Sequence, residues 1–289
     1  MDTSQEHNAD PSAEAAAGLY IVATPIGNLN DLTLRAAETL RAAVLIGAED
    51  TRVTGKLLKH IGARAPMIRH DEHSAERARP ELIERAKTEA VAIVSDAGTP
   101  LISDPGYRLV REARAAGVRV VPVPGVSAVT AALSGAGLPT DRFLFAGFPP
   151  PKEKALKDKL GELGRVKATL VFYETGPRLG RFLSAAADIL GEREACVARE
   201  LTKLHEEFLF QPLPGLAAHY AERGPPKGEI VVLIGPPESE GGATGEDLDE
   251  ALRAALESAS LKDAVKAVTA QLGLPRSQVY ARALELKTE

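Results

Sequence analysis

The sequence predicts an α/β protein made of two consecutive α/β domains and a small helical tail. Short apolar, β-branched runs alternate with stretches of helical period over most of the chain, a pattern typical of mainly parallel sheets covered on both faces. The 289 residues are long enough for two domains with separate cores. The final segment has helical periodicity alone, which predicts a third, all-helical unit.

The N-terminal domain is expected to begin with a strand at 19–28 that ends in a Pro/Gly turn. Asn30 or Asp31 is the expected cap of the first helix. Pro80 is expected to break or restart the third helix. The other elements keep the alternation, with strands at 44–49, 66–70, 90–96 and 118–125 and helices at 31–43, 54–62, 74–89 and 107–117.

The C-terminal α/β domain has a less regular order of elements. Two late strands, 195–203 and 205–211, have no helix between them, which predicts a mixed sheet. The remaining expected elements are helices at 126–137, 152–163, 177–191 and 213–223 and strands at 142–149, 168–174 and 227–236.

The tail is expected to form three helices with a short Gly-containing turn between the last two, as in a helix-turn-helix. Its expected core positions are Leu261, Val265, Val268, Leu272, Val279, Ala283 and Leu286. The predicted division is a disordered tail over 1–17, α/β domains over 18–124 and 125–237, a linker over 238–247 and a helix-turn-helix-like domain over 248–289.

Composition excludes several classes of protein. A net charge of -5 argues against a basic nucleic-acid coat, so any RNA contact would use a local basic face. The single cysteine, Cys196, excludes an internal disulfide, and no Cys/His spacing resembles a zinc site. With neither a membrane-spanning apolar run nor a basic signal-peptide region, the expected location is the cytoplasm.

The segment SDAGTPLISDPG, residues 95–106, connects an expected strand to an expected helix. Ligands of open parallel sheets bind beyond the carboxyl ends of the strands, where this loop falls. It carries Asp96 and Asp104 in place of basic residues, which favours a ligand with hydroxyls and a positive centre, such as S-adenosylmethionine, over a polyphosphate. The alternative is that both carboxylates only cap turns or helices.

Three further polar loops follow strands of this domain, at 23–28, 47–52 and 69–73. In the second, Glu49, Asp50 and Arg52 are crowded together, and a mutual ion pair is the simpler account. The two histidines of the third could suggest a metal, but an exposed polar turn is the favoured interpretation. Four such loops on one sheet edge are stronger evidence for a site than any one alone.

The C-terminal domain contributes four candidate segments with ordinary structural alternatives. Ser127 in PGVSA begins a helix, where capping is its simpler role. For the aromatic pair in FYET, 172–175, core packing is the simpler account. The segments ARELTK, 198–203, and KGE, 227–229, place charges near strand ends.

The motifs ATPIGN, EDTR, SDAGTPLISDPG, PGVSA, GFPP, FYE, ARELTK, HEE and KGEIVVLIG, in this order, resemble the tetrapyrrole methylase superfamily. More narrowly they resemble its bacterial 16S rRNA 2′-O-ribose methyltransferases. The resemblance covers residues 18–289, and the pairing of AEDTR with SDAGTPLISDPG is its specific part. The stretch DEHSA, 71–75, departs from the Asn-rich stretch expected in relatives.

The resemblance implies a homodimer that binds S-adenosylmethionine between the two α/β domains and uses no metal. The implied acceptor is the ribose of cytidine 1402 in the decoding centre of 16S rRNA, within the 30S ribosomal subunit. Two alternatives stay open: a tetrapyrrole C-methyltransferase, which shares the fold and the donor, and a non-catalytic nucleic-acid-binding regulator whose α/β part senses a ligand.

The resemblance also assigns residues to the site. At the methionine end of the donor it places Asp96, Ala97, Gly98, Thr99 and Ile102, with Ser127 and Ala128 also in contact. On the adenosine side it places Tyr173, Ala198, Gly228 and Glu229, with Pro25 and Gly27 at the floor of the cleft. The candidates for the base are Glu49, Asp50, Asp104 and Glu200, and those for RNA phosphate contacts are Arg52, Arg199 and Lys203.

Overall fold

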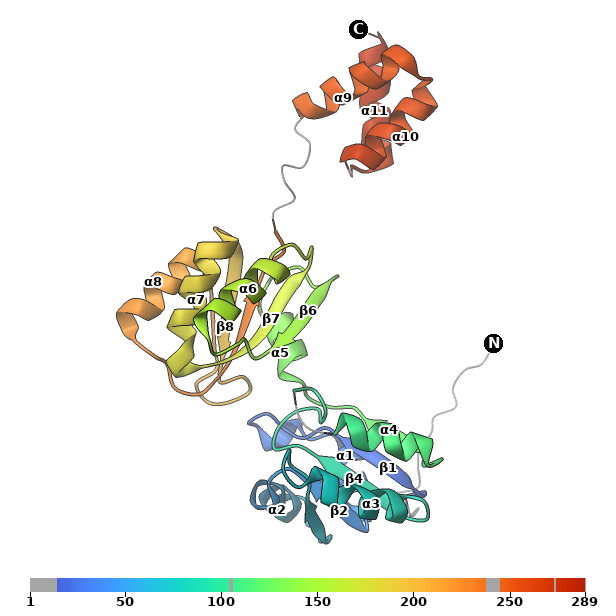
Figure 1. Cartoon of the computed structure of the whole chain (residues 1–289), viewed down its shortest axis with the longest axis vertical. Coiled ribbons are helices and arrows are strands. Elements are labelled where there is room, and N and C mark those ends of the chain that lie inside the picture. The colour runs from blue at the N-terminus through green and yellow to red at the C-terminus, as the bar shows by residue number, and fades with distance from the viewer. Residues whose placement is uncertain (1–14, 104–105, 238–244, 273, 289) are drawn as a thin grey trace. The chain divides into compact units, whose positions relative to one another are not determined.

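The computed structural model describes residues 15–103, 106–237, 245–272 and 274–288. Contacts within the chain define one unit that ends at Pro236 and a second that begins at Pro237 (Figure 1). Helix α9 (Gly245–Ser258) begins three residues before the predicted start of the tail domain. Most of the predicted N-terminal tail and linker lies outside the described residues.

The first sheet is parallel throughout, with strand order β3-β2-β4-β1-β5. Its strands are β1 (Gly18–Val22), β2 (Leu45–Ala48), β3 (Met67–Arg69), β4 (Ala90–Val94) and β5 (Val120–Val123). Helices α1 (Leu34–Ala42) and α2 (Thr51–His60) pack on one face, and α3 (Ala75–Ala86) and α4 (Tyr107–Ala115) on the other. The predicted doubly covered parallel sheet is confirmed.

The second sheet is mixed, with order β6-β7-β10-β8-β9, as the two adjacent late strands predicted. Its strands are β6 (Phe143–Gly147), β7 (Thr169–Thr175), β8 (Glu194–Arg199), β9 (Glu207–Pro212) and β10 (Glu229–Ile234). Figure 1 shows α6 (Glu153–Leu163), α7 (Gly176–Leu190) and α8 (Leu213–Arg223) together on one face. The other face packs against α5 (Ala128–Gly135) and against Ile26 from the first half of the chain.

The described part of the second unit contains three helices, α9, α10 (Leu261–Leu272) and α11 (Arg276–Thr288), around a small core. Four predicted core positions, Val265, Val268, Val279 and Ala283, are fully buried. The other three, Leu261, Leu272 and Leu286, are half-buried and pack against them. The predicted helical tail and its core are therefore confirmed.

Three local expectations were wrong, and the structure gives the reason for the first and the last. Thr33, rather than Asn30 or Asp31, caps α1, because a short 3₁₀ helix (η1, Leu29–Asp31) comes first; the Thr33 hydroxyl accepts the Ala36 N–H at 3.1 Å. Helix α3 continues through Pro80. Strand β8 ends at Arg199, four residues early, because Glu200 turns the backbone with a φ of 53°.

No helix among the described residues is long and apolar enough to cross a membrane.

Candidate functional site

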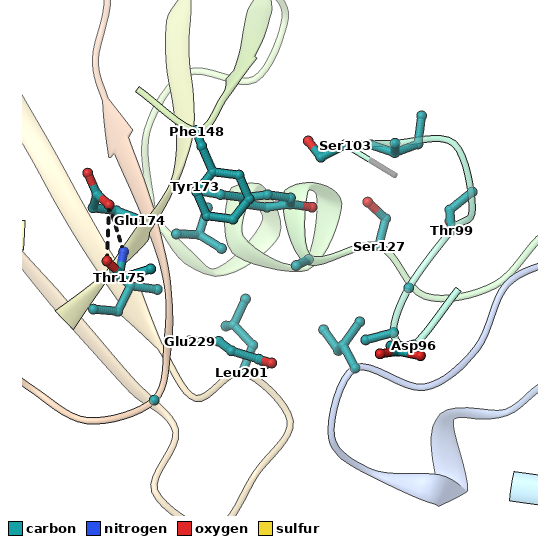
Figure 2. A pocket seen from close by; sticks show the side chains of 18 of the residues that line it. Asp96, Thr99, Ser103, Ser127, Phe148, Tyr173, Glu174, Thr175, Leu201 and Glu229 are labelled. Carbon is teal, nitrogen blue, oxygen red and sulfur yellow. Dashed lines mark hydrogen bonds between the residues drawn. The ribbon is translucent and has the colours of Figure 1, made fainter. Parts of the chain in front are cut away.

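One cavity of about 320 Å³ lies where the strand-end loops of the first sheet meet the second sheet (Figure 2). Among the described residues, four carboxylates belong to its wall and no lysine or arginine does. The wall consists of Ile26, Glu49, Asp96, Ala97, Gly98, Thr99, Ile102, Ser103, Ser127, Ala128, Phe148, Tyr173, Glu174, Thr175, Leu201, Gly228, Glu229, Ile230 and Val231.

The loop after β4 is fixed against the loop after β1. The backbones of Thr24 and Gly98 form a two-way bridge, with N···O distances of 2.9 and 3.0 Å. Gly98 has a φ of 76°, a left-handed conformation that glycine adopts without strain. The Thr99 hydroxyl donates to the Val126 carbonyl at 3.1 Å, which connects this loop to the segment that enters α5. Hydrogen bonds to two other segments therefore hold this part of the cavity wall in place.

Asp96 is also tied to the loop after β2. One of its carboxylate oxygens accepts the Asp50 N–H at 3.0 Å, and its own N–H donates to the Glu49 carboxylate at 3.2 Å. Burial raises the pKa of Asp96, and the nearby Asp50 charge adds to the effect, against the lowering influence of the Asp50 N–H and Arg52. A cationic ligand would relieve this unfavourable environment of the charged form.

The loop after β4 also carries backbone strain beside the cavity. Leu101 and Ser103 have φ values of 73° and 69°, in a region that residues with a side chain seldom occupy. Such strain is concentrated at functional sites in proteins generally. Asp104, one of the predicted base candidates, lies outside the described residues.

The second sheet contributes an aromatic and acidic wall. Tyr173 on β7 packs edge-on against Phe145 and Phe148, with ring centroids 4.8 and 5.5 Å apart. The next residue, Glu174, is buried and accepts the Thr175 N–H at 2.8 Å. Burial raises the pKa of Glu174, and Arg178, whose Nε lies 3.3 Å from the carboxylate, opposes this shift.

A second group of charges lies where β8 ends and β10 begins. The Lys203 ammonium donates to Glu200 at 2.7 Å and to Glu229 at 3.0 Å. Burial would lower the pKa of Lys203, but its two carboxylate partners outweigh burial and raise it. Glu200 also accepts the Glu229 N–H at 3.2 Å, and its pKa is lowered chiefly by Lys203.

The three predicted RNA-contacting residues differ in how they are held. The Arg52 side chain is 87% exposed and pairs with Asp50 at 2.6 Å, which is the mutual ion pair considered above. That pairing holds the pKa of Asp50 far below its usual range. Arg199 donates to Glu207 and to the Lys227 carbonyl, so it and Lys203 are both engaged within the protein.

The loop at 69–73 is a polar turn, with one exception. His73 is exposed, and Asp71 accepts the Ser74 N–H and hydroxyl. His70, in contrast, is buried; burial and then the nearby Arg79 lower its pKa. Among the described residues no group of three or more His, Cys, Asp or Glu could hold a metal ion.

Comparison with known proteins identifies the family. Residues 18–217 match the family described as tetrapyrrole (corrin/porphyrin) methylases, and residues 242–287 match the RsmI C-terminal HTH domain. A ribosomal RNA small subunit methyltransferase I from Erythrobacter litoralis is 54% identical over 98% of this chain and 99% of its own. The chain belongs to the ribosomal RNA small subunit methyltransferase I family. The protein of that name from Mesorhizobium japonicum is 47% identical over 96% of this chain and 95% of its own.

Solved structures support the fold of this methyltransferase family. Diphthine synthase aligns with a TM-score of 0.58 at 18% identity, over 75% of this chain and 89% of its own. Uroporphyrin-III C-methyltransferase from Thermus thermophilus, complexed with S-adenosyl homocysteine, aligns with a TM-score of 0.53 at 21% identity. That alignment covers 75% of this chain and 97% of the other. At these identities the likeness bears on the fold alone.

Most of the donor-contact residues that the family resemblance suggested lie on the cavity wall: Asp96, Ala97, Gly98, Thr99, Ile102, Ser127, Ala128, Tyr173, Gly228 and Glu229. Pro25, Gly27 and Ala198 do not line it. Gly27 instead leaves room for Lys203, whose Cγ lies 2.5 Å from where a Cβ would stand. Ala198 is fully buried beneath α5.

Several wall residues were not predicted as site residues, although each lies in one of the motifs quoted above: Ile26, Ser103, Phe148, Glu174, Thr175, Leu201, Ile230 and Val231. Glu174 and Phe148 stand in the quoted motifs FYE and GFPP, so a charge or a ring directly at a strand end was the available signal. Among the base candidates, Glu49 lines the cavity, whereas Asp50 and Glu200 do not.

Proposed function

We propose that this chain transfers a methyl group from S-adenosylmethionine to the ribose 2′-oxygen of cytidine 1402 in 16S rRNA. The observation that supports the donor is the charge of the cavity wall, to which the described residues contribute four carboxylates and no lysine or arginine. S-adenosylmethionine carries a sulfonium and an α-ammonium, both of which favour such a wall. At about 320 Å³ the cavity has the size of a small-molecule site.

The apolar part of the wall suits the rest of the donor. Ile230, Val231 and Tyr173 offer an apolar and aromatic surface for an adenine ring. Asp96 and Glu229 are the carboxylates available to its cationic and hydroxyl groups. When bound, S-adenosylmethionine supplies a methyl carbon whose bond to sulfur is already activated by the positive charge.

The protein must then align the acceptor oxygen and receive its proton. The new O–CH₃ bond forms as the C–S bond breaks, and the electron pair of that bond stays on sulfur. We favour Glu49 as the base among the described candidates, because it lines the cavity and its carboxylate is held by the Asp96 N–H. Asp50 is a weak base, since Arg52 holds its pKa low.

The named relatives support ribosomal RNA as the acceptor. The direct test is incubation of the protein with 30S subunits and S-adenosylmethionine labelled in the methyl group. Alkaline cleavage of RNA requires a free 2′-hydroxyl, so methylation at cytidine 1402 predicts one missing band at that position. Labelled RNA with a complete ladder would refute ribose methylation while leaving rRNA methylation intact.

The same assay separates the alternatives. A tetrapyrrole C-methyltransferase would label uroporphyrinogen III and not the 30S subunit, and a regulator would label neither. We also propose that the protein acts as a homodimer in the cytoplasm, as the resemblance implies. Light scattering of the purified chain tests the dimer.

A further inference from the structure

Phe148 is an exposed aromatic ring at a cavity whose other aromatic residue is packed. Its side chain belongs to the cavity wall, yet the residue is 55% exposed. Aromatic residues make up only 4% of the chain, and three of them, Phe145, Tyr173 and Phe148, form a continuous edge-to-face series. Figure 2 shows the last two rings at the cavity. The series leads from half-buried Phe145 to a ring that water can reach.

The backbone around Phe148 is fixed in several ways. The pairing of β6 with β7 shifts register between Phe145 and Gly147, and Gly147 has a φ of 65°. Pro149 and Pro150 follow and restrict the chain further. Arg178 donates to the Pro149 carbonyl and anchors the loop to α7. The ring is therefore held in an exposed position by a preorganised loop, which lowers the entropic cost of binding to it.

Opposite Phe148, the cavity wall is formed by the strained loop after β4, which carries Ser103. A Cβ on Gly147 would lie 3.6 Å from the Ser103 hydroxyl, so the loops that carry Phe148 and Ser103 approach each other here. Figure 2 shows Ser103, Thr99 and Ser127 on the side of the cavity facing Phe148 and Tyr173. A planar group that rested on Phe148 would thus lie between the two halves.

We propose that Phe148 is a stacking surface for the base of the acceptor nucleotide. This inference rests on the proposed function, because it assumes an RNA acceptor. A cavity of about 320 Å³ takes one molecule of the size of the donor, so the acceptor nucleotide approaches from the solvent side, where Phe148 is exposed. Bases taken out of RNA structure are commonly held by stacking on aromatic side chains.

The test compares Phe148→Leu with Phe148→Tyr and with a matched control, Phe143→Leu. Phe143 begins β6, the strand that ends directly before Phe148; it is 47% exposed and does not line the cavity. Two quantities are measured for each variant: the Kd of S-adenosylhomocysteine by calorimetry, and KM and kcat for 30S subunits. Loss of one stacked base is expected to lower kcat/KM for 30S subunits about 5- to 150-fold.

The expected result is a loss confined to the acceptor in Phe148→Leu, recovery in Phe148→Tyr, and wild-type behaviour in Phe143→Leu. Equal kcat/KM values for Phe148→Leu and Phe143→Leu would overturn the proposal. A Kd for S-adenosylhomocysteine weakened by the same factor would overturn it too, by assigning the ring to the adenine of the donor. Wild-type protein that never labels 30S subunits would instead refute the proposed function, and this inference with it.

Discussion

Replacing Arg178 with Met should lower the free energy of unfolding, because it leaves the buried Glu174 carboxylate without its ion-pair partner. The Glu174 side chain is 1% exposed, and Arg178, at 29% exposed, is the ion-pair partner 3.3 Å away. Methionine keeps an unbranched apolar chain in place of the arginine stem and removes the charge. Breaking a fully buried pair costs about 3–5 kcal/mol.

The expected cost of breaking the Glu174–Arg178 pair is smaller than for a fully buried pair. Arg178 is partly exposed, and Glu174 keeps the Thr175 N–H at 2.8 Å, so we expect about 2 kcal/mol for the uncompensated carboxylate. Loss of the hydrogen bond to the Pro149 carbonyl adds about 1 kcal/mol. Arg178→Met should therefore lower the free energy of unfolding by about 3 kcal/mol at neutral pH.

The pH dependence of the cost separates the contribution of the uncompensated Glu174 carboxylate from that of the lost hydrogen bond to Pro149. The folded-state pKa of Glu174 is raised above its ordinary value of 4.5, so the folded protein binds more protons than the unfolded chain, and stability falls as pH rises through this window. Without Arg178 the pKa rises further, and the window extends upward. The cost of the substitution should shrink toward about 1 kcal/mol as the pH falls and Glu174 becomes protonated, because the neutral carboxyl group needs no charged partner.

Urea unfolding followed by far-UV circular dichroism, at acidic and neutral pH, provides the measurement. The control is the same substitution in a Glu174→Gln background, where the cost should stay near 1 kcal/mol at both pH values. A cost that is the same at both pH values, or the same in both backgrounds, would refute a charged Glu174 that depends on Arg178.

Three other outcomes are expected. Asp96→Asn should weaken S-adenosylmethionine binding by about 1.5–3 kcal/mol, the range for a hydrogen bond to a charged group, and calorimetry that finds an unchanged Kd would remove Asp96 from the donor site. Arg52→Ala should leave that Kd intact and lower methylation of 30S subunits, because the side chain is 87% exposed; a parallel loss of donor affinity would contradict this. Deleting residues 245–289 should preserve donor binding and raise KM for 30S subunits through loss of a tethered contact. An unchanged KM would argue against a substrate-binding tail, and a shift to monomer in light scattering would assign it to the dimer interface.

The order of elements was predictable because each depends on local periodicity. Both sheets and the three tail helices lie where apolar spacing indicated, and the mixed second sheet followed from two strands with no helix between them. The exact ends were less predictable. The first helix begins after a 3₁₀ turn that no periodic pattern marks, and β8 stops because Glu200 adopts a left-handed backbone.

The polar strand-end loops were predictable parts of the site, whereas contacts between the halves were not. Ala198 lies two residues after Cys196 on β8, so both side chains are on the same face of the sheet, where they are buried in the core that includes α5. Phe148 has the hydrophobicity of a core residue, yet it is exposed just beyond the register shift of β6 against β7, a feature that no local pattern marks. Ile26 joins the core beneath α5 only through the tertiary fold.

The two halves of the chain supply different parts of the candidate site, so neither half forms it alone. The first half brings Asp96 and Glu49 on loops fixed to each other by hydrogen bonds, and the second brings the ring of Tyr173. The halves are joined beside the cavity by the Thr99–Val126 hydrogen bond and by the packing of Ile26 under the second sheet. Because these joining contacts adjoin the wall itself, a ligand that touches both halves adds contacts across the same junction. Donor binding should therefore stabilise the junction as well as the loops, by the general rule that a ligand favours the state to which it binds.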